Sequence, residues 1–191
     1  MNYIKAFILT AVVFCFSSLK AYALTENQAK EYIQKVSGAL ELILNETREK
    51  EVIYKDFENL FSTYGDVPII TRYLIGPPSR EMSKSQMKKA ELEIRRYLAV
   101  KYGKQFEKYI GAQISIRNLS SKKNSATVET NFVSPNQNFI VSWVVSDKSG
   151  EIKLVDIIIE GVSMLRIERE EIGARLEKAR FDVNILLEEL N

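Results

Sequence analysis

The sequence contains no histidine, and its single cysteine is Cys15, near the amino terminus. Without histidine, a Ser-His-Asp type of catalytic triad is excluded, and so is the side chain that most often binds transition metals. With one cysteine, no disulfide can form within the chain. The fold must therefore be stabilised by its hydrophobic core, and any chemistry must rest on carboxylates, hydroxyls and lysines.

Residues 1–23 have the three parts of a secretory signal peptide. MNYIK is positively charged, AFILTAVVFCF is apolar, and Ala21-Tyr22-Ala23 has the A-x-A cleavage pattern. The apolar part is too short to span a bilayer comfortably. Cys15 lies inside it and not at the cleavage point, so lipidation is not expected. We predict cleavage after Ala23, export to the periplasm, and one domain over residues 24–191.

The chain also lacks a large excess of charge of either sign. It has 27 basic and 25 acidic residues, and removal of Lys5 and Lys20 with the signal peptide leaves 25 of each. Proteins that bind nucleic acid normally carry a clear basic excess. We therefore expect no nucleic-acid partner.

Apolar residues at helical spacing predict helices in the first half of the domain. Capping-box patterns begin at Thr25 and at Ser83, and each precedes an apolar stripe. A further stripe ends at Gly65. Pro68 then suits the first turn of a short helix that ends at Gly76.

The pattern changes after residue 111. Four stretches rich in Val, Ile, Thr and Phe, separated by turn residues, predict an antiparallel meander over residues 112–118, 126–133, 139–146 and 152–160. Ser163 suits the N-cap of a helix that reaches about Lys178, and a short helix ends the chain. Helices, then a sheet, then helices predict an α+β domain.

Asp156 and Glu160 are the acidic residues of the apolar stretch LVDIIIEGVSML, residues 154–165. Four residues apart on a strand, they would share a face at a distance of roughly 13 Å, at ~3.3 Å per residue. Two carboxylates that act on one bond are expected about 5 to 9.5 Å apart. We therefore expect this pair to hold a strand end or to pair with arginine, and not to catalyse a reaction. No spacing suggests a metal site or a cofactor motif.

The remaining feature is the large number of aliphatic and aromatic side chains. Composition by itself favours an ordinary packed core. An antiparallel sheet curled against helices can also leave an internal pocket for a ligand. The residues alone leave both explanations open.

Two stretches resemble a known family, the MlaC-like periplasmic phospholipid-binding proteins of the Mla pathway, also called the toluene-tolerance or ABC-transporter auxiliary family. They are DVPIITRYLIG, residues 66–76, and VDIIIEGVS, residues 155–163. Arg80, Gln86 and Arg169 also fall on family positions. The chain departs from the pattern at residues 77–79, where Pro-Pro-Ser replaces an aromatic pair, at Glu168, where the family has tyrosine, and at Ala179-Arg180, where it has Gly-Gly.

The resemblance implies a curved sheet of about four strands, with N-terminal and C-terminal helices that enclose a deep apolar pocket for phospholipid acyl chains. It implies a monomeric carrier, without enzymatic activity or cofactor, that contributes to outer-membrane lipid asymmetry. Its partners would be an inner-membrane ABC transporter with an MCE-domain subunit and an outer-membrane lipoprotein–porin complex. The alternatives are a carrier of a hopanoid or another isoprenoid lipid, and a small exported enzyme.

Within this interpretation, twelve residues are predicted to line the lipid pocket. Three come from the short helix after Pro68, four from the alternating third strand, and five from the stretch around Gly161. They are Ile70, Tyr73, Leu74, Phe139, Val141, Trp143, Val145, Val155, Ile157, Ile159, Val162 and Leu165. Gly161 is expected to allow a sharp turn from strand to helix.

Overall fold

The structure, a computed structural model, describes residues 24–190 except residue 47. The expected signal peptide, residues 1–23, lies outside the described residues. The described elements are α1 (Glu26–Asn45), α2 (Lys50–Tyr64), α3 (Val67–Ile75), the 3-10 helix η1 (Pro77–Arg80), α4 (Lys84–Gly103), the 3-10 helix η2 (Phe106–Tyr109), β1 (Gln113–Lys122), β2 (Ser125–Val133), β3 (Asn138–Ser146), β4 (Lys153–Ile159), β5 (Val162–Ser163), α5 (Met164–Lys178) and α6 (Val183–Glu189).

The predicted helix starts are confirmed by their caps. Thr25 caps α1 and Ser83 caps α4, each in a reciprocal capping box with a glutamine three residues later. Asp66 caps α3, whose first turn contains Pro68. These local signals set where each helix begins, independently of the rest of the fold.

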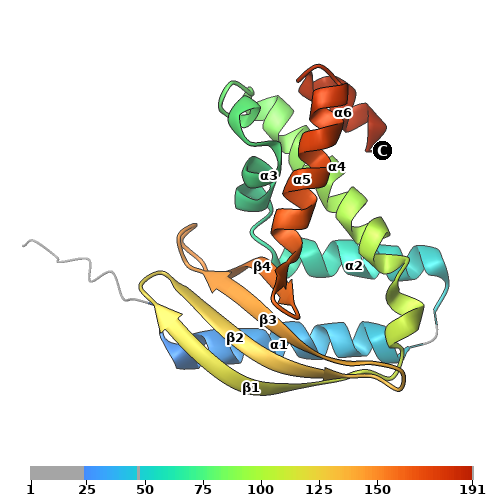
Figure 1. Cartoon of the computed structure of the whole chain (residues 1–191), viewed down its shortest axis with the longest axis vertical. Helices are drawn as coiled ribbons and strands as arrows, with labels where there is room; N and C mark the ends of the chain where they lie inside the picture. Colours follow the sequence, from blue (N-terminus) through green and yellow to red (C-terminus); the bar gives the residue numbers. More distant parts are fainter. Residues whose placement is uncertain (1–23, 47, 191) are drawn as a thin grey trace, which may run out of the picture.

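The five strands form one antiparallel sheet in the order β1-β2-β3-β4-β5. The four predicted strands are present, and β1 extends further than expected, to Lys122. The expected number of strands is exceeded by one, because the chain turns back after β4 and adds the two-residue strand β5. Figure 1 shows a curved, open sheet with α1 along it and helices α3 to α6 gathered at the other end of the molecule.

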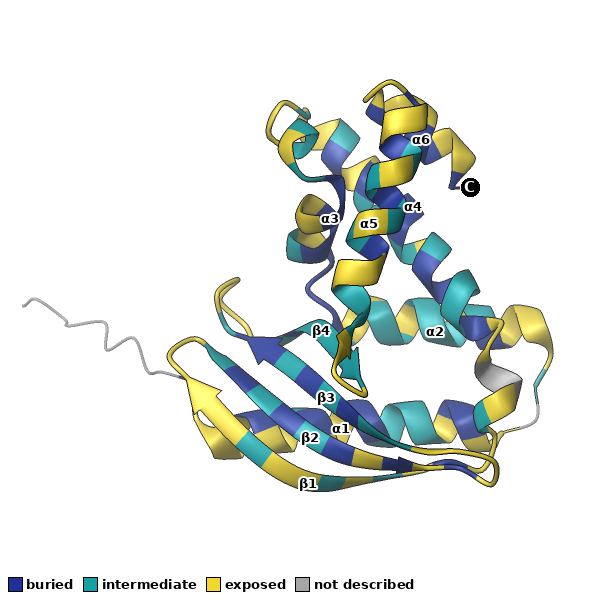
Figure 2. Ribbon diagram, viewed as in Figure 1, coloured by how far each residue is buried: buried dark blue, intermediate teal, exposed yellow. Residues whose placement is uncertain are grey.

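The buried side chains form two cores, on either side of α2 in Figure 1. The sheet core joins α1 and the start of α2 to the sheet and contains Leu24, Ala29, Ile33, Val36, Ile43, Leu44, Ile53, Ala112, Ala126, Val128, Phe132, Val141, Trp143, Val145 and Leu154. The helical core joins α3, α4, α5 and α6 and contains Ile70, Leu74, Ile75, Ala90, Ile94, Leu98, Ile172, Leu176, Ala179, Val183, Leu186, Leu187 and Leu190. Figure 2 shows these buried positions as dark bands along the inner sides of both regions.

The two regions are joined where α2 meets α3. The backbone N–H of Asp66 donates to the carbonyl of Leu154 on β4 at 2.8 Å, and Gly65 forms a parallel bridge to the same residue. The Tyr32 hydroxyl of α1 donates to the Tyr64 carbonyl at 2.6 Å. None of the helices in the described part of the chain combines the length and apolar character needed to cross a membrane.

Candidate functional site

A cavity of about 430 Å³ lies where the sheet core meets the helical core. This volume falls in the range of about 300 to 1,000 Å³ that is typical of sites for small-molecule ligands. Helices α1 to α5 contribute to its wall, together with strands β2, β3 and β4. Most of the lining side chains are aliphatic or aromatic.

The sheet side of the cavity follows from alternation and register. Trp143 on β3 lies opposite Ile157 on β4, and Val141 lies opposite Ile159. Since directly opposed residues project from the same face of a sheet, all four share one face. With Phe132 and Phe139 they form what we call the sheet wall. The rings of Phe132 and Phe139 stack, with centroids 4.7 Å apart.

The buried indole of Trp143 has a polar partner within this wall. Its Nε1–H donates to the Thr130 hydroxyl at 2.9 Å, and that hydroxyl donates to the Val141 carbonyl at 3.2 Å. Thr130 is fully buried and Trp143 is 3% exposed. The hydrogen bonds satisfy the two polar groups, so the indole can face an apolar cavity without an unpaired N–H.

The bulge in β4 supplies two neighbouring wall residues. The partner of Val144 is Asp156 and that of Val145 is Leu154, which leaves Val155 as the extra residue. Leu154, Val155 and Asp156 all line the cavity. In a regular strand, side chains alternate between the two faces, so these three consecutive residues could not all face the cavity.

Nine of the twelve predicted residues line the cavity. They are Ile70, Leu74, Phe139, Val141, Trp143, Val155, Ile157, Ile159 and Leu165. The geometry brings them together from α3, β3, β4 and α5. Contact with a lipid stays a prediction for each of them.

Tyr73, Val145 and Val162, the other three, lie outside the described lining of this cavity. Tyr73 is 46% exposed, because α3 turns Ile70 and Leu74 inward, four residues apart, and Tyr73 outward. Val145 is fully buried in the sheet core, opposite Ala126. Val162 is 42% exposed, because it belongs to the two-residue strand at the edge of the sheet.

Several lining residues were visible in the sequence only as helical stripes. Val36, Leu40 and Leu44 of α1 face the cavity at intervals of four, and Phe57 and Leu60 of α2 lie across from them. Their spacing indicates a buried helix face. It does not indicate that the face borders a cavity, because a packed core has the same pattern.

The acidic residues of LVDIIIEGVSML hold the junction of β4, β5 and α5. Asp156 accepts hydrogen bonds from the Ser163 hydroxyl at 2.6 Å and from the Leu165 N–H at 3.0 Å. The Glu160 carboxylate accepts from the Ile140 N–H. One of the two expected roles, holding a strand end, is therefore confirmed, since the hydrogen bonds to these carboxylates come from backbone N–H groups and the Ser163 hydroxyl.

Gly161 acts differently from the expectation. Glu160 has φ +48° and Gly161 has φ +80°, and Ile159 pairs with Val162 across them. Positive φ at both central residues is the geometry of a two-residue hairpin turn, in which glycine is strongly preferred. The chain therefore makes a hairpin first, and α5 begins afterwards at its predicted N-cap, Ser163.

Arg169 of α5 is held against the end of α3. Its guanidinium donates to the Leu74 carbonyl, and a Cβ at Gly76 would collide with the same guanidinium. Gly76 also has φ +70°, a conformation that glycine adopts at little cost. Gly76, which ends the first family-like stretch, therefore makes room for Arg169, which follows the second stretch.

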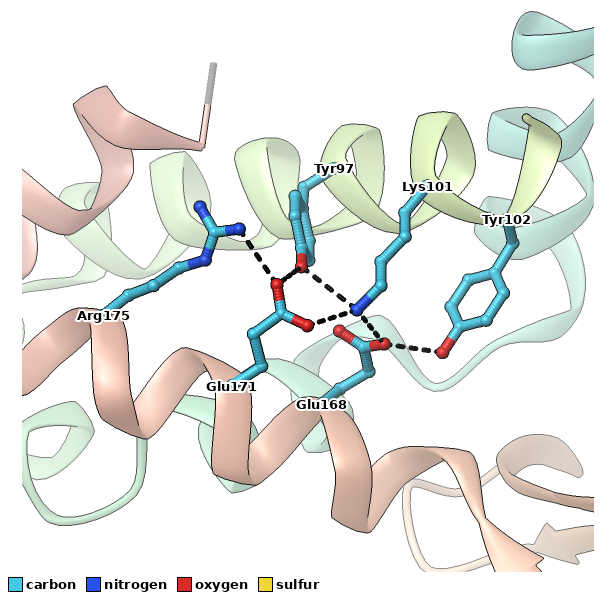
Figure 3. A network of polar contacts seen from close by, with 6 residues as sticks. All are labelled: Tyr97, Lys101, Tyr102, Glu168, Glu171 and Arg175. Atoms are coloured by element: carbon cyan, nitrogen blue, oxygen red, sulfur yellow. Dashed lines mark hydrogen bonds and ion pairs between the residues drawn. The ribbon is translucent and has the colours of Figure 1, made fainter. Parts of the chain in front are cut away.

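The remaining side of the cavity carries a polar group of residues, which we call the α4–α5 cluster: Tyr97, Lys101, Tyr102, Glu168, Glu171 and Arg175. Figure 3 shows α4 and α5 joined through these side chains. Lys101 Nζ lies 2.7 Å from Glu168 and 2.5 Å from Glu171. The Tyr102 hydroxyl donates to Glu168, and the Tyr97 hydroxyl donates to Glu171, both at 2.6 Å. Lys101, Tyr102 and Glu168 also line the cavity.

These contacts shift the protonation equilibria of the cluster. Burial, with the hydrogen bond to Glu171, raises the pKa of Tyr97 to about 12. Burial and the hydrogen bond to Glu168 raise the pKa of Tyr102 as well. Hydrogen bonds from Lys101 and Tyr97 lower the pKa of Glu171 to about 2. For Lys101, burial acts to lower the pKa, but the carboxylate partners outweigh it and the pKa is raised. Lys101 and Glu171 are therefore a charged pair across neutral pH, and the hydroxyl of Tyr97 beside them stays neutral.

No sequence pattern predicted this cluster, because its three α4 residues and its three α5 residues lie about 70 positions apart in the chain and each is of a type common on helix surfaces. Within residues 24–190, apart from residue 47, no group of three or more acidic side chains is arranged to hold a metal ion. The arrangement can enclose an apolar ligand and present polar groups at one side of it.

A solved structure and a protein-family model both match this chain. The chain resembles the solved structure of a phospholipid-binding protein from Ralstonia solanacearum in complex with a phospholipid, with a TM-score of 0.67, 12% sequence identity, and coverage of 86% of this chain and 93% of that one. No curated protein matches the sequence. The family model described as MlaC protein matches residues 30–191. The chain therefore belongs to the MlaC family.

Proposed function

We propose that this protein is a phospholipid carrier that holds acyl chains in the cavity between its two cores. The observation that carries the proposal is the cavity itself, a space of about 430 Å³ with a largely aliphatic and aromatic lining in a chain of the MlaC family. The Ralstonia solanacearum protein of the same fold was solved with a phospholipid. The nine predicted residues in the lining are the proposed contacts for the chains.

The affinity would come from the hydrophobic effect. Each buried CH₂ contributes about 0.8 kcal/mol, so an acyl chain gains more free energy in this cavity than a few polar contacts could supply. The cavity wall has no histidine and no cysteine, so it lacks the base that most often activates a serine and the thiol that most often acts as a nucleophile. Binding and release of an unchanged lipid fits these residues better than hydrolysis.

The proposed setting is the periplasm, within an Mla-type system. The carrier would exchange phospholipid with an inner-membrane ABC transporter that has an MCE-domain subunit and with an outer-membrane lipoprotein–porin complex. The signal-peptide pattern of residues 1–23 and membership of the MlaC family support this setting.

Mass spectrometry of lipid extracted from the exported, purified protein tests the proposal. The expected result is phospholipid in a stoichiometric amount. A hopanoid or another isoprenoid lipid would replace the proposed cargo, and protein that neither retains lipid nor takes it up from phospholipid vesicles would contradict a carrier function. Transfer of labelled phospholipid to vesicles with and without the reconstituted transporter tests the proposed partner.

A further inference from the structure

The cavity lining contains few side chains that can donate a hydrogen bond. Those with an N–H or O–H donor among the described lining residues are Tyr64, Lys101, Tyr102, Gln105, Tyr109 and Trp143. The phosphate of a phospholipid is an anion that accepts hydrogen bonds, so it binds to donors and to positive charge. The donors that are free therefore indicate where a lipid phosphate can lie.

Three of the six donor side chains are already engaged within the protein. Lys101 Nζ lies 2.7, 2.5 and 3.3 Å from three acceptors of the α4–α5 cluster, which engages its three N–H donors. The Tyr102 hydroxyl donates to Glu168, and the Trp143 indole N–H donates to Thr130. These side chains have no donor left for a phosphate.

The start of α5, where a helix can offer backbone N–H groups to an anion, is engaged as well. The Leu165 N–H donates to the Asp156 carboxylate, and the Arg166 N–H donates to the Ser163 hydroxyl, both at 3.0 Å. Asp156 and Glu168 are the acidic residues of the described lining, and both lie on this side. A phosphate here would meet two carboxylates and no free donor of the lining, which disfavours the α5 side.

A free donor lies on the opposite side of the opening, just after α4. Gln105 and Ile167 are the exposed residues of the described lining, so the cavity opens to solvent between the end of α4 and the start of α5. The Gln105 amide has no hydrogen-bond partner in the described chain. Figure 1 shows that this segment leads from α4 to the sheet.

The Tyr109 hydroxyl is a second free donor on the same side. The Tyr109 ring contacts Phe132 and Phe139 edge-on, with centroids 5.5 and 5.7 Å apart, so it continues the sheet wall. Its hydroxyl has no partner among the described residues and is not one of their covered, unpaired polar atoms, so it is accessible. Tyr64, the remaining donor, lies at the other end of the wall, beside the start of β4 at Leu154.

The same segment also carries positive charge. Residues 101–109 contain three lysines and one glutamate. The Lys108 N–H donates to the Gln105 carbonyl at 3.3 Å, and side chains three residues apart in such a turn project from the same side. Lys108 is exposed and has no ion-pair partner in the described part of the chain. Its ammonium can therefore reach an anion beside Gln105.

We propose that the phosphate of the bound phospholipid lies between Gln105, Lys108 and Tyr109, which we call the phosphate subsite. The inference rests on the function proposed above. The Gln105 amide and the Tyr109 hydroxyl donate hydrogen bonds to phosphate oxygens, and Lys108 supplies the positive charge. The acyl chains extend from this point along the sheet wall. The subsite recognises the phosphodiester that phospholipids share, so it does not recognise a diacylglycerol, which has the chains without the phosphate.

Retention of two lipids with the same acyl chains tests the subsite. Delipidated protein is incubated with phosphatidylglycerol vesicles that contain a small fraction of diacylglycerol, and mass spectrometry gives the ratio of the two bound lipids. Tyr109→Phe keeps the ring against Phe132 and Phe139 and removes only the hydroxyl. Relative to unaltered protein, it should lower the ratio of phosphatidylglycerol to diacylglycerol about tenfold, the effect of one hydrogen bond to a charged group. An unchanged ratio would overturn the proposal.

Tyr64→Phe makes the same change at the other end of the sheet wall. It should leave the ratio within about twofold of that of the unaltered protein, because Tyr64 lies away from the opening. A drop in the ratio for Tyr64→Phe and not for Tyr109→Phe would place the phosphate at the start of β4 and contradict the subsite.

Lys108→Gln and Arg166→Gln compare two exposed cations on opposite sides of the opening. Lys108→Gln should lower the ratio about threefold, the effect of one exposed ion pair, and Arg166→Gln should leave it unchanged. An effect of Arg166→Gln alone would place the phosphate on the α5 side. Equal effects of both variants would show that net charge decides. Either result would overturn the subsite.

Inorganic phosphate separates a lipid phosphate from a free one. Calorimetric titration of delipidated protein with inorganic phosphate should give no saturable heat, because without acyl chains only a few exposed contacts remain. Saturable binding that Tyr109→Phe abolishes would assign these residues to free phosphate and overturn the assignment to lipid. If unaltered protein binds neither lipid, the carrier function itself is contradicted, whereas bound lipid with equal ratios in all variants overturns the subsite alone.

Discussion

The two sides of the cavity differ in how they are built. The sheet wall is apolar and regular, and opposed residues such as Trp143 and Ile157 face inward because side chains alternate along strands. The opposite side, at α4 and α5, combines apolar residues with paired charges such as Lys101 and Glu168. The sheet wall offers apolar contacts, whereas the α4–α5 cluster consists of charged and hydroxyl groups that bind one another. One side of the cavity is therefore built by apolar packing within a sheet, and the other by apolar packing together with ion pairs between two helices.

The largest effect is expected from placing a charge at two positions on the inner face of the sheet. Val145 is fully buried in the packed sheet core, whereas Ile157 lines the cavity. Val145→Asp would bury an unpaired carboxylate, so we expect a loss of several kcal/mol in the free energy of unfolding. Ile157→Asp should keep a near-native circular dichroism spectrum, because water can enter an emptied cavity, but it should lose co-purifying lipid.

Ile159→Asp repeats this test at a second cavity-lining residue. Unfolding of Ile157→Asp and Ile159→Asp together would mean that the sheet wall is solid core and that its difference from the helical side has been misjudged. Lipid retained by both folded variants would place the bound chains elsewhere.

A smaller effect is expected from the α4–α5 cluster at alkaline pH. The folded protein holds the Tyr97 proton up to about pH 12, whereas an unperturbed tyrosine releases it near pH 10. The contribution of this proton to stability is therefore complete below pH 10 and is lost as the pH rises to about 12. Tyr97→Phe removes the hydrogen bond that Tyr97 donates to Glu171 at 2.6 Å and the longer one that it accepts from Lys101 at 3.3 Å. We expect this loss to lower the free energy of unfolding at pH 8 by about 1 kcal/mol. The substitution should also reduce the further loss between pH 10 and 12.

Urea titrations at pH 8, 10 and 12 measure both quantities. Tyr73→Phe is the control, since Tyr73 is exposed and lies outside the α4–α5 cluster. An alkaline loss as large in Tyr97→Phe as in the unaltered protein would show that the cluster does not couple α4 to α5 through this proton. Tyr102 remains in the variant, so the loss should shrink and not vanish.

The smallest effect is spectroscopic. Trp143 is the one tryptophan of the chain and borders the cavity. When lipid is removed, water can occupy the space beside the indole, so its fluorescence emission should move to longer wavelength with little change in stability. Spectra of loaded and delipidated protein that coincide would show that the sheet wall does not contact the bound chains.

Much of the architecture follows from the sequence by itself. Short-range rules are sufficient for the caps at Thr25, Ser83 and Ser163, because a capping side chain bonds to backbone only three residues away. The inward face of β3 follows from strict alternation at Val141 and Trp143. The apolar stripes of α1 and α2 can also be recognised in the sequence from their helical spacing. In each case the pattern and the structure it specifies lie within one element.

Three features were decided by the tertiary structure. Val141 and Val145 both alternate inward on β3 and both belong to the sheet core, but only Val141 also lines the cavity. The bulge at Val155 arises from pairing between two strands. The α4–α5 cluster arises because packing brings Lys101 to Glu168, 67 residues further along the chain. A sequence specifies which face of an element is apolar, whereas a cavity and the charges beside it depend on how far apart separate elements come to rest.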